Sequence, residues 1–94
     1  MQTFMLFGKY TVDAIGKISA ERTTKLTDLV KKHGGEIRSL YALLGTPDLV
    51  LTLDLPGYKE ATTLSLALTR VMGINFTTAA AITVDEFDKL AARA

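Results

Sequence analysis

The sequence predicts an α+β domain built as a ferredoxin-like βαββαβ plait, with a four-stranded antiparallel sheet, two long helices and a short C-terminal helix. Two observations carry this prediction. Four short segments with strand periodicity alternate with two amphipathic helical segments, and glycine or proline separates most of them. The segment at 48–55 also carries leucine at every second position, which makes a strand face that helices must cover.

Length and composition agree with one domain spanning residues 1–94. The chain of 94 residues is 48% hydrophobic and 22% charged, which is the balance of a folded globular protein. A domain of this size buries only about two thirds of the surface that its unfolded chain exposes, so a partner surface would add to its stability. We find no internal repeat, low-complexity tract or linker.

The first strand is predicted at residues 3–10 and is apolar on both faces. Phe4 and Leu6 fall on one face, and Met5 and Phe7 fall on the other. A short run of this kind is typical of a strand that is buried on both sides.

A weak helical segment, residues 11–18, comes next. It is long enough for one or two turns, in which Val12, Ile15 and Ile18 are expected to make apolar contacts. Gly16 limits the length of this helix, because glycine costs about 1 kcal/mol relative to alanine in a helix interior.

The first long helix is predicted to begin at Ser19 and to end at the glycine pair 34–35. Ser19 is a favourable N-cap, and Glu21 suits the positive end of the helix dipole. One of the two glycines supplies the left-handed residue that closes a helix. The inner face follows the i, i+3, i+4, i+7 spacing and consists of Leu26, Leu29, Val30 and His33.

Two strands follow, at residues 36–44 and 48–55, and the turn sequence Gly45-Thr46-Pro47-Asp48 joins them. In the second of these strands the leucines face one way, whereas Val50 and Thr52 face the other, because the side chains of a strand alternate. The leucine face is therefore expected to pack against helices.

The rest of the chain predicts a helix at 58–72, a strand of small residues at 74–82 and a short last helix that begins at a capping box, Thr83 to Glu86. Gly73 is the expected C-cap of the longer helix. The apolar stripe of that helix consists of Ala61, Leu64, Leu68, Val71 and Met72. The inward side of the last helix is expected to consist of Phe87, Leu90 and Ala91.

This order places the first and third strands at the centre of the sheet and both long helices on one face. The opposite face carries Met5 and Phe7 from the first strand and Val50 and Thr52 from the third, an apolar patch that a monomer would expose. The sequence therefore predicts a homodimer that stacks two such faces into an α/β barrel-like sandwich, with Val50 and Thr52 in the interface.

The residues also resemble a known family. The matching segments run in order over nearly the whole chain and are Phe4 to Thr11, Ile18, Glu21-Arg22, His33 to Ile37, Tyr41, Gly45 to Val50, Asp54, Pro56, the second long helix with Gly73, Thr78 and Glu86-Phe87. On these residues the chain resembles the GYD-domain family of small bacterial and archaeal proteins. The resemblance implies the dimeric α/β-barrel type of fold and no established reaction. One departure is that the family pattern G-x-Y-D reads Gly45-Thr46-Pro47-Asp48 here, with proline in place of the tyrosine.

Composition excludes several classes of chemistry. The chain has no cysteine, so it forms no disulfide, thiolate nucleophile or Cys-ligated metal site. Its one histidine, His33, cannot build a multi-histidine site within one chain and is expected to be structural at a helix end. We therefore expect no metal and no cofactor.

Nucleic acid and membranes are not expected as partners. A net charge of +1 gives no electrostatic reason for nucleic acid binding. No apolar run reaches the roughly 20 residues that span a bilayer, and the N-terminal residues lack the pattern of a signal peptide. A cytoplasmic location is the expectation.

The candidate ligand-binding residues are polar groups at strand ends, on the third strand and in the first turn of the first long helix. They are Tyr10, Thr11, Arg22, Tyr41, Asp48 and Thr52. A structural role competes in most cases: packing for the tyrosines, helix capping for the threonine and an exposed salt bridge for the arginine. Asp48 and Asp54 lie about 20 Å apart along a strand, too far for an acid/base pair. One is expected to cap a turn and the other to face solvent.

Three functions stay open. The first is a homo-oligomeric module that binds a small apolar or amphipathic ligand between the facing sheets. The second, reached by fold analogy, is a cofactor-independent enzyme of the monooxygenase or isomerase type. The third is a structural or regulatory assembly partner. A filled interface would favour assembly, an apolar cavity would favour binding, and a cavity with convergent ionisable groups would favour catalysis.

Overall fold

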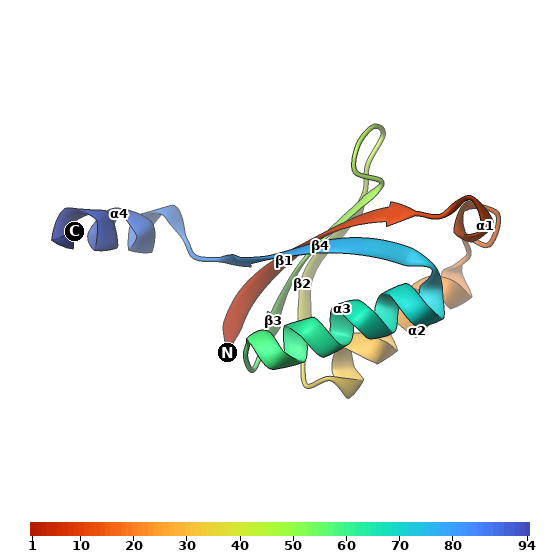
Figure 1. The fold of residues 1–94 in the computed structure, drawn as a ribbon, viewed down its shortest axis with the longest axis horizontal. Coiled ribbons are helices and arrows are strands. Elements are labelled where there is room, and N and C mark those ends of the chain that lie inside the picture. The colour runs from red at the N-terminus through yellow and green to blue at the C-terminus, as the bar shows by residue number, and fades with distance from the viewer.

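The computed structural model describes residues 1–94 and shows a four-stranded sheet with two long helices on one face (Figure 1). In chain order, the elements are β1 (Gln2–Tyr10), α1 (Val12–Ile15), α2 (Ala20–Lys32), β2 (Glu36–Ala42), β3 (Leu49–Leu55), α3 (Tyr58–Met72), β4 (Ile74–Ala81) and α4 (Val84–Arg93). The sheet is antiparallel throughout and has the order β2-β3-β1-β4, so β1 and β3 are central. The predicted plait is confirmed.

The ends of the helices follow the capping chemistry of the sequence. The Ser19 hydroxyl accepts the backbone N–H of Arg22 at 3.2 Å, and the Thr83 hydroxyl accepts that of Glu86 at 3.1 Å. After α2 and α3 the chain adopts positive φ at glycine, +79° at Gly34 and +68° at Gly73. These local signals explain the ends of the helices. The predicted strands and the 58–72 helix differ from the observed ones by at most two residues at an end.

The leucines of β3 form the centre of the core. Leu51, Leu53 and Leu55 are completely buried. The other buried residues of this core are Phe4, Leu6, Leu26, Val30, Leu49, Ala61, Leu64, Leu68, Met72 and Ile74. Val71, which was predicted in the stripe of α3, is exposed, so the buried stripe is narrower than expected.

A β-bulge in β2 decides which of its side chains reach the core. The pairing with β3 shifts between Ile37 and Ser39, so Arg38 is the extra residue. After the shift, Leu40 packs against the core like Ile37, although the two would point to opposite faces of a regular strand. The bulge therefore keeps both apolar side chains of β2 on the helix side.

No helix covers the second face of the sheet, which we call the open face (Figure 1). The pairing of the central strands places Met5 opposite Thr52 and Phe7 opposite Val50. These four side chains are half-buried. The loop at 43–48 projects on the same side of the sheet, and its Leu44 is fully exposed. The predicted uncovered apolar face is therefore present.

The last helix contradicts the prediction. Phe87 and Leu90 are 59% and 49% exposed, and no residue of α4, Ala91 included, is buried. An inward face of α4 would require the chain to turn back toward the sheet after β4. Instead, α4 continues away from the sheet beyond the end of β4 (Figure 1).

The contacts expected after β1 are also wrong. Val12, Ile15 and Ile18 are all exposed, and Ala14 is the buried residue of α1. Ala14 lies against Gly73, where an added Cβ would be 3.3 Å from the Thr11 hydroxyl oxygen and 3.4 Å from the Ala14 methyl carbon. Ala14 packs over Gly73, and the larger side chains of α1 and the residues after it are exposed.

The chain exposes more surface than a compact monomer of its mass. Its accessible surface is 6358 Å², whereas a folded monomer of 10.2 kDa has about 5,300 Å². The radius of gyration is 14.2 Å, against about 12 Å for a compact domain of this length. The excess area is about 1,000 Å², comparable with the roughly 800 Å² that each partner buries in a stable interface.

Candidate functional site

A small apolar pocket lies on the helix side of the sheet, where β1 leads into α1. Its volume is about 40 Å³. Its apolar wall consists mainly of Leu26, Leu40, Leu49, Met72 and Ile74. Tyr10 and Arg22 line the same pocket, and Ile18 forms part of its exposed rim. Two of the predicted ligand residues therefore meet at one apolar cavity.

Tyr10 is the polar group most altered by this environment. Burial raises the pKa of the Tyr10 phenol above its usual 10.0, the Asp48 carboxylate raises that pKa further, and the Arg22 guanidinium partly opposes both. The hydroxyl has no hydrogen-bond partner within the chain and is open to solvent. At neutral pH it is therefore protonated and free to donate a hydrogen bond.

Arg22 is bound at the start of α2 and at the end of α3. Its backbone N–H is bound by the Ser19 cap, and its guanidinium donates to the backbone carbonyl of Met72 in the last turn of α3. This bond satisfies a carbonyl that the helix itself leaves without a partner. Because a guanidinium has five N–H donors, this one bond leaves others for a ligand.

Asp48 ties β1 to the start of β3. Its carboxylate accepts the backbone N–H of Tyr10 at 2.9 Å, and its own N–H donates to the Gly8 carbonyl at 2.9 Å. Asp48 therefore has a structural role, but its carboxylate links two strands and does not cap the turn as expected. In that role it also sets the position of Tyr10 at the pocket.

The other candidates do not join this site. Thr11 accepts the Ala14 N–H at 3.2 Å and is the N-cap of α1. Tyr41 is 63% exposed and lies opposite Val50 on the open face. Thr52 lies on that face as well, between Met5 and Ser39 of the neighbouring strands.

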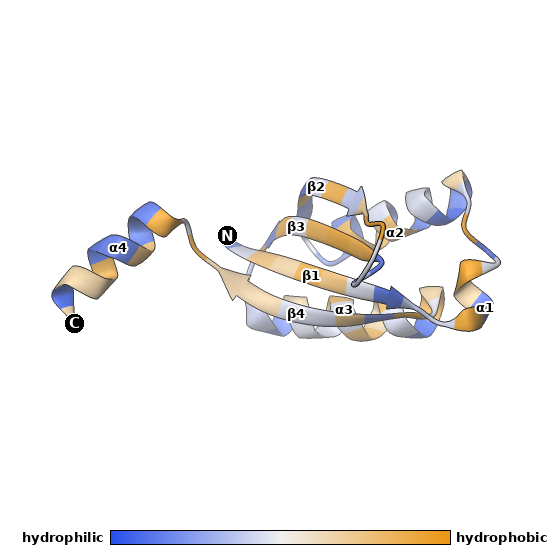
Figure 2. Ribbon diagram, turned by 90° about the horizontal axis from the view of Figure 1, so that it is seen from above, coloured by the Kyte–Doolittle hydropathy of each residue, from blue (hydrophilic) through white to orange (hydrophobic).

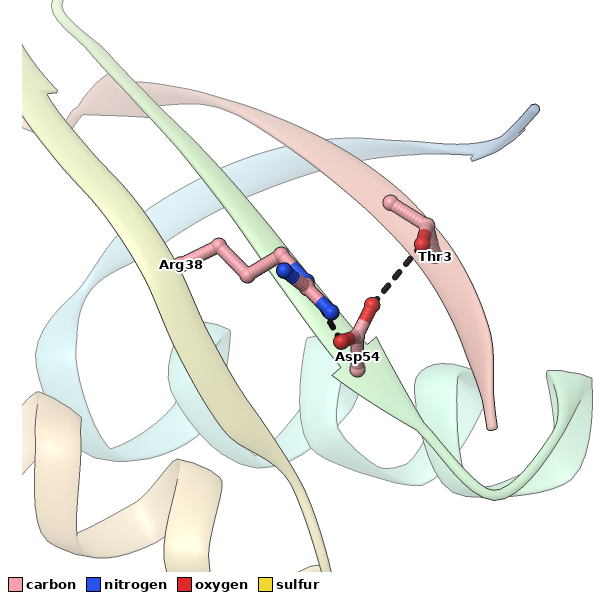
Figure 3. A network of polar contacts seen from close by, with 3 residues as sticks. All are labelled: Thr3, Arg38 and Asp54. Atoms are coloured by element: carbon pink, nitrogen blue, oxygen red, sulfur yellow. Dashed lines mark hydrogen bonds and ion pairs between the residues drawn. The ribbon is translucent and has the colours of Figure 1, made fainter. Parts of the chain in front are cut away.

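A second polar cluster, the Thr3–Asp54–Arg38 network, occupies one end of the open face (Figure 3). The Thr3 hydroxyl donates to one oxygen of Asp54 at 2.8 Å, and the Arg38 Nε donates to the other at 2.5 Å. These two hydrogen bonds, that of Thr3 first, lower the pKa of the Asp54 carboxyl below its usual value. Asp54 is only 7% exposed, so the expectation that it faces solvent is wrong.

Sequence reasoning missed this network because its three members are far apart in the chain. Thr3 pairs with Asp54 across β1 and β3, and the bulge in β2 brings Arg38 beside them. The available signal was the parity of Asp54, which placed it on the same side of β3 as Val50 and Thr52.

His33 is structural, as expected. It is the C-cap residue of α2, and its Nδ1 lies 2.8 Å from the Leu29 carbonyl oxygen. No group of three or more His, Cys, Asp or Glu side chains is arranged to hold a metal ion. None of the helices has the length and apolar character needed to cross a membrane.

These features define a class of protein: a single-domain α+β plait with one helix-covered and one open sheet face and a small apolar pocket at the sheet end. The comparison with known families is more specific. The family model of the GYD domain matches residues 4–91 of the 94, and the chain belongs to the GYD domain family. A comparison with curated proteins finds no match.

Proposed function

We propose that the protein is a homodimer that binds a small amphipathic ligand at the Tyr10–Arg22 pocket. The observation that carries this proposal is the combination of an apolar wall with a free phenol hydroxyl and a guanidinium at one cavity. Pockets of this composition are typical of small-molecule sites, in which few polar groups orient a largely apolar ligand.

The polar groups indicate the chemistry of the ligand. The protonated Tyr10 hydroxyl donates a hydrogen bond, and Arg22 carries a positive charge. Both favour a ligand that ends in a carboxylate or another anionic acceptor. Because a water molecule needs about 10–15 Å³, the 40 Å³ pocket holds a short apolar group, and a longer ligand would extend past the exposed Ile18.

The dimer is supported by the open face. Met5, Phe7 and Val50 form an apolar strip that no helix of this chain covers. Stacking two such strips would bury it, at about 25 cal/mol per Å² of apolar area. A ligand between the two facing sheets stays a prediction, whereas the Tyr10–Arg22 pocket is formed by one chain alone.

The electrostatics of the pocket favour binding over the enzymatic alternative. General acid–base catalysis is most efficient when the pKa of the catalytic group lies near the working pH. The pKa of Tyr10 moves away from neutral pH. Its hydroxyl is therefore suited to hold a ligand rather than to exchange a proton with it.

Native mass spectrometry of the purified protein tests the dimer and can also reveal a carried ligand. We expect the mass of a dimer, with or without a carried ligand. A thermal-shift series of short fatty carboxylates against alcohols of equal length then tests the ligand class. The carboxylates should raise the melting temperature more.

Tyr10→Phe removes the hydroxyl and leaves the ring. It should weaken carboxylate binding by about 3- to 10-fold, the effect of one hydrogen bond. Tyr41→Phe, the same change on the open face, is the matched control and should bind normally. If no carboxylate shifts the melting temperature, or if both variants bind alike, the proposed site is wrong.

A further inference from the structure

The last helix is amphipathic and has no partner within the chain. Its apolar side chains are exposed, and no hydrogen bond joins α4 to the sheet or to the other helices. Apolar and polar residues alternate around it in Figure 2. The apolar side of α4 consists of Val84, Phe87, Leu90 and Ala91.

Local interactions alone do not stabilise such a helix. α4 has 10 residues, and isolated helices shorter than about 12–15 residues are marginal in water. The Thr83 cap contributes about 1 kcal/mol, and the exposed Asp85–Lys89 pair contributes a few tenths. A stable α4 therefore needs a surface on which to dock its apolar side.

A groove of matching character runs between α3 and the edge strand β4, and we call it the flank groove. Its volume is about 410 Å³. It is lined by Phe4, Tyr58, Ala61, Thr62, Ser65, Leu66, Phe76, Thr78 and Ala80. None of these side chains is charged. The groove follows α3 from Tyr58 to Leu66, about 12 Å at 1.5 Å per residue, and α4 is about 15 Å long.

The hydroxyl groups of Thr62, Ser65 and Thr78 in the flank groove are already used, and Tyr58 at its end is 69% exposed. Ser65 and Thr78 share a hydrogen bond of 2.6 Å across it, and Thr62 donates to the Tyr58 carbonyl at 2.8 Å. An apolar helix face can therefore cover Thr62, Ser65 and Thr78 without leaving their hydroxyl groups unpaired. This is the helix-in-groove mode of recognition.

The occupant that fits the flank groove is α4 of a second copy. In the same chain, α4 lies beyond the end of β4 and away from α3, one wall of the flank groove (Figure 1). The surface excess of about 1,000 Å² also matches what one subunit buries in a stable dimer. We propose that α4 of each subunit docks in the flank groove of the other, a reciprocal contact with twofold symmetry. This contact does not depend on the proposed ligand pocket.

The first test is Phe87→Glu, which places a charge at the middle of the docking face. Because α4 has no contact with the core, the variant should keep the circular dichroism spectrum of the sheet. Analytical ultracentrifugation should show the dimer dissociation constant raised at least about tenfold. The control is Ala92→Glu, on the polar side of α4, and it should have no effect. Unchanged association of Phe87→Glu would overturn the proposal.

The second test uses the absence of native cysteine. Phe87→Cys and Thr62→Cys are made in separate chains. Position 87 lies near the middle of α4 and position 62 near the middle of the flank groove, so the two cysteines should meet whichever way the helix runs along the groove. Mixed and oxidised, the two variants should form a covalent heterodimer. Ala92→Cys mixed with Thr62→Cys should not.

A chain that carries both Phe87→Cys and Thr62→Cys distinguishes docking of the chain's own α4 from docking of the α4 of a second copy. If the doubly substituted chain closes into a monomeric disulfide while the mixed single variants do not cross-link, α4 folds back on its own chain, and the proposed exchange is wrong. Failure of this test with a normal ligand response leaves the proposed ligand site standing.

Discussion

The two faces of the sheet are built from the same central strands and differ in what covers them. On the helix face, Leu51 and Leu53 are completely buried beneath α2 and α3. On the open face, Val50 and Thr52 of the same strand keep part of their surface exposed. Strand alternation supplies apolar side chains to both faces, but the chain has helices for only one. The comparison teaches that strand alternation alone does not bury a sheet face: in this structure the open face is left without a covering helix, α4 included.

The strongest change on the helix face is Leu51→Glu. It places a carboxylate with no partner at a completely buried position, at a cost comparable with the total stability of about 5–15 kcal/mol. We expect no folded protein, seen as loss of the cooperative melting transition by circular dichroism. Leu51→Met conserves volume and should cost less than about 1.5 kcal/mol. A near-normal melting transition for Leu51→Glu would show that the helices do not seal this face.

Val50→Glu is the matched change one residue away, on the open face. The subunit should keep its fold, because this side chain is not in the core of its own chain. Within a stacked dimer, however, the charge would be buried without a partner, and the variant should dissociate or become insoluble. Light scattering measures the outcome. Thr63→Glu, on the exposed side of α3, is the control for added charge. A soluble Val50→Glu variant with unchanged oligomeric mass would contradict the face-to-face dimer.

Asp54→Asn tests the polar end of the open face. Of the three substitutions, it should have the smallest effect on stability. Because the pKa of Asp54 is lowered in the fold, its charged form stabilises the protein above the usual pKa, and this contribution is lost as the pH falls through the lowered value. The variant should melt below the native protein at neutral pH, and the difference should shrink in acid.

Thermal melts from about pH 7 to about pH 2 measure that difference. Asp28→Asn, on the exposed side of α2, is the control and should change little across this range. A deficit for Asp54→Asn that stays equal at both ends of the range would show that the charge is not the stabilising feature.

The order of the elements could be predicted from the sequence because its signals are local. Strand periodicity, the Ser19 and Thr83 caps and the glycines after α2 and α3 each act within a few residues, so neighbouring residues suffice to predict them. The leucine parity of β3 acts in the same way and correctly oriented the core.

The polar sites could be predicted only in part. Tyr10, Arg22 and Asp48 were candidates as residue types, but their convergence depends on helix packing and on the pairing of strand ends. Thr3, Arg38 and Asp54 meet through strand pairing and a bulge. No short-range pattern encodes such contacts, because their partners lie up to 51 residues apart.

The sequence by itself determined which segments are helices and strands, most of their ends to within two residues, and which side of β3 is buried. The tertiary structure alone decided where α4 goes. An amphipathic pattern specifies that a helix needs a docking surface, but it does not specify which surface, because the hydrophobic effect has no direction. In this chain, that surface is not its own core: α4 leaves the sheet with its apolar side exposed, and the flank groove stays uncovered.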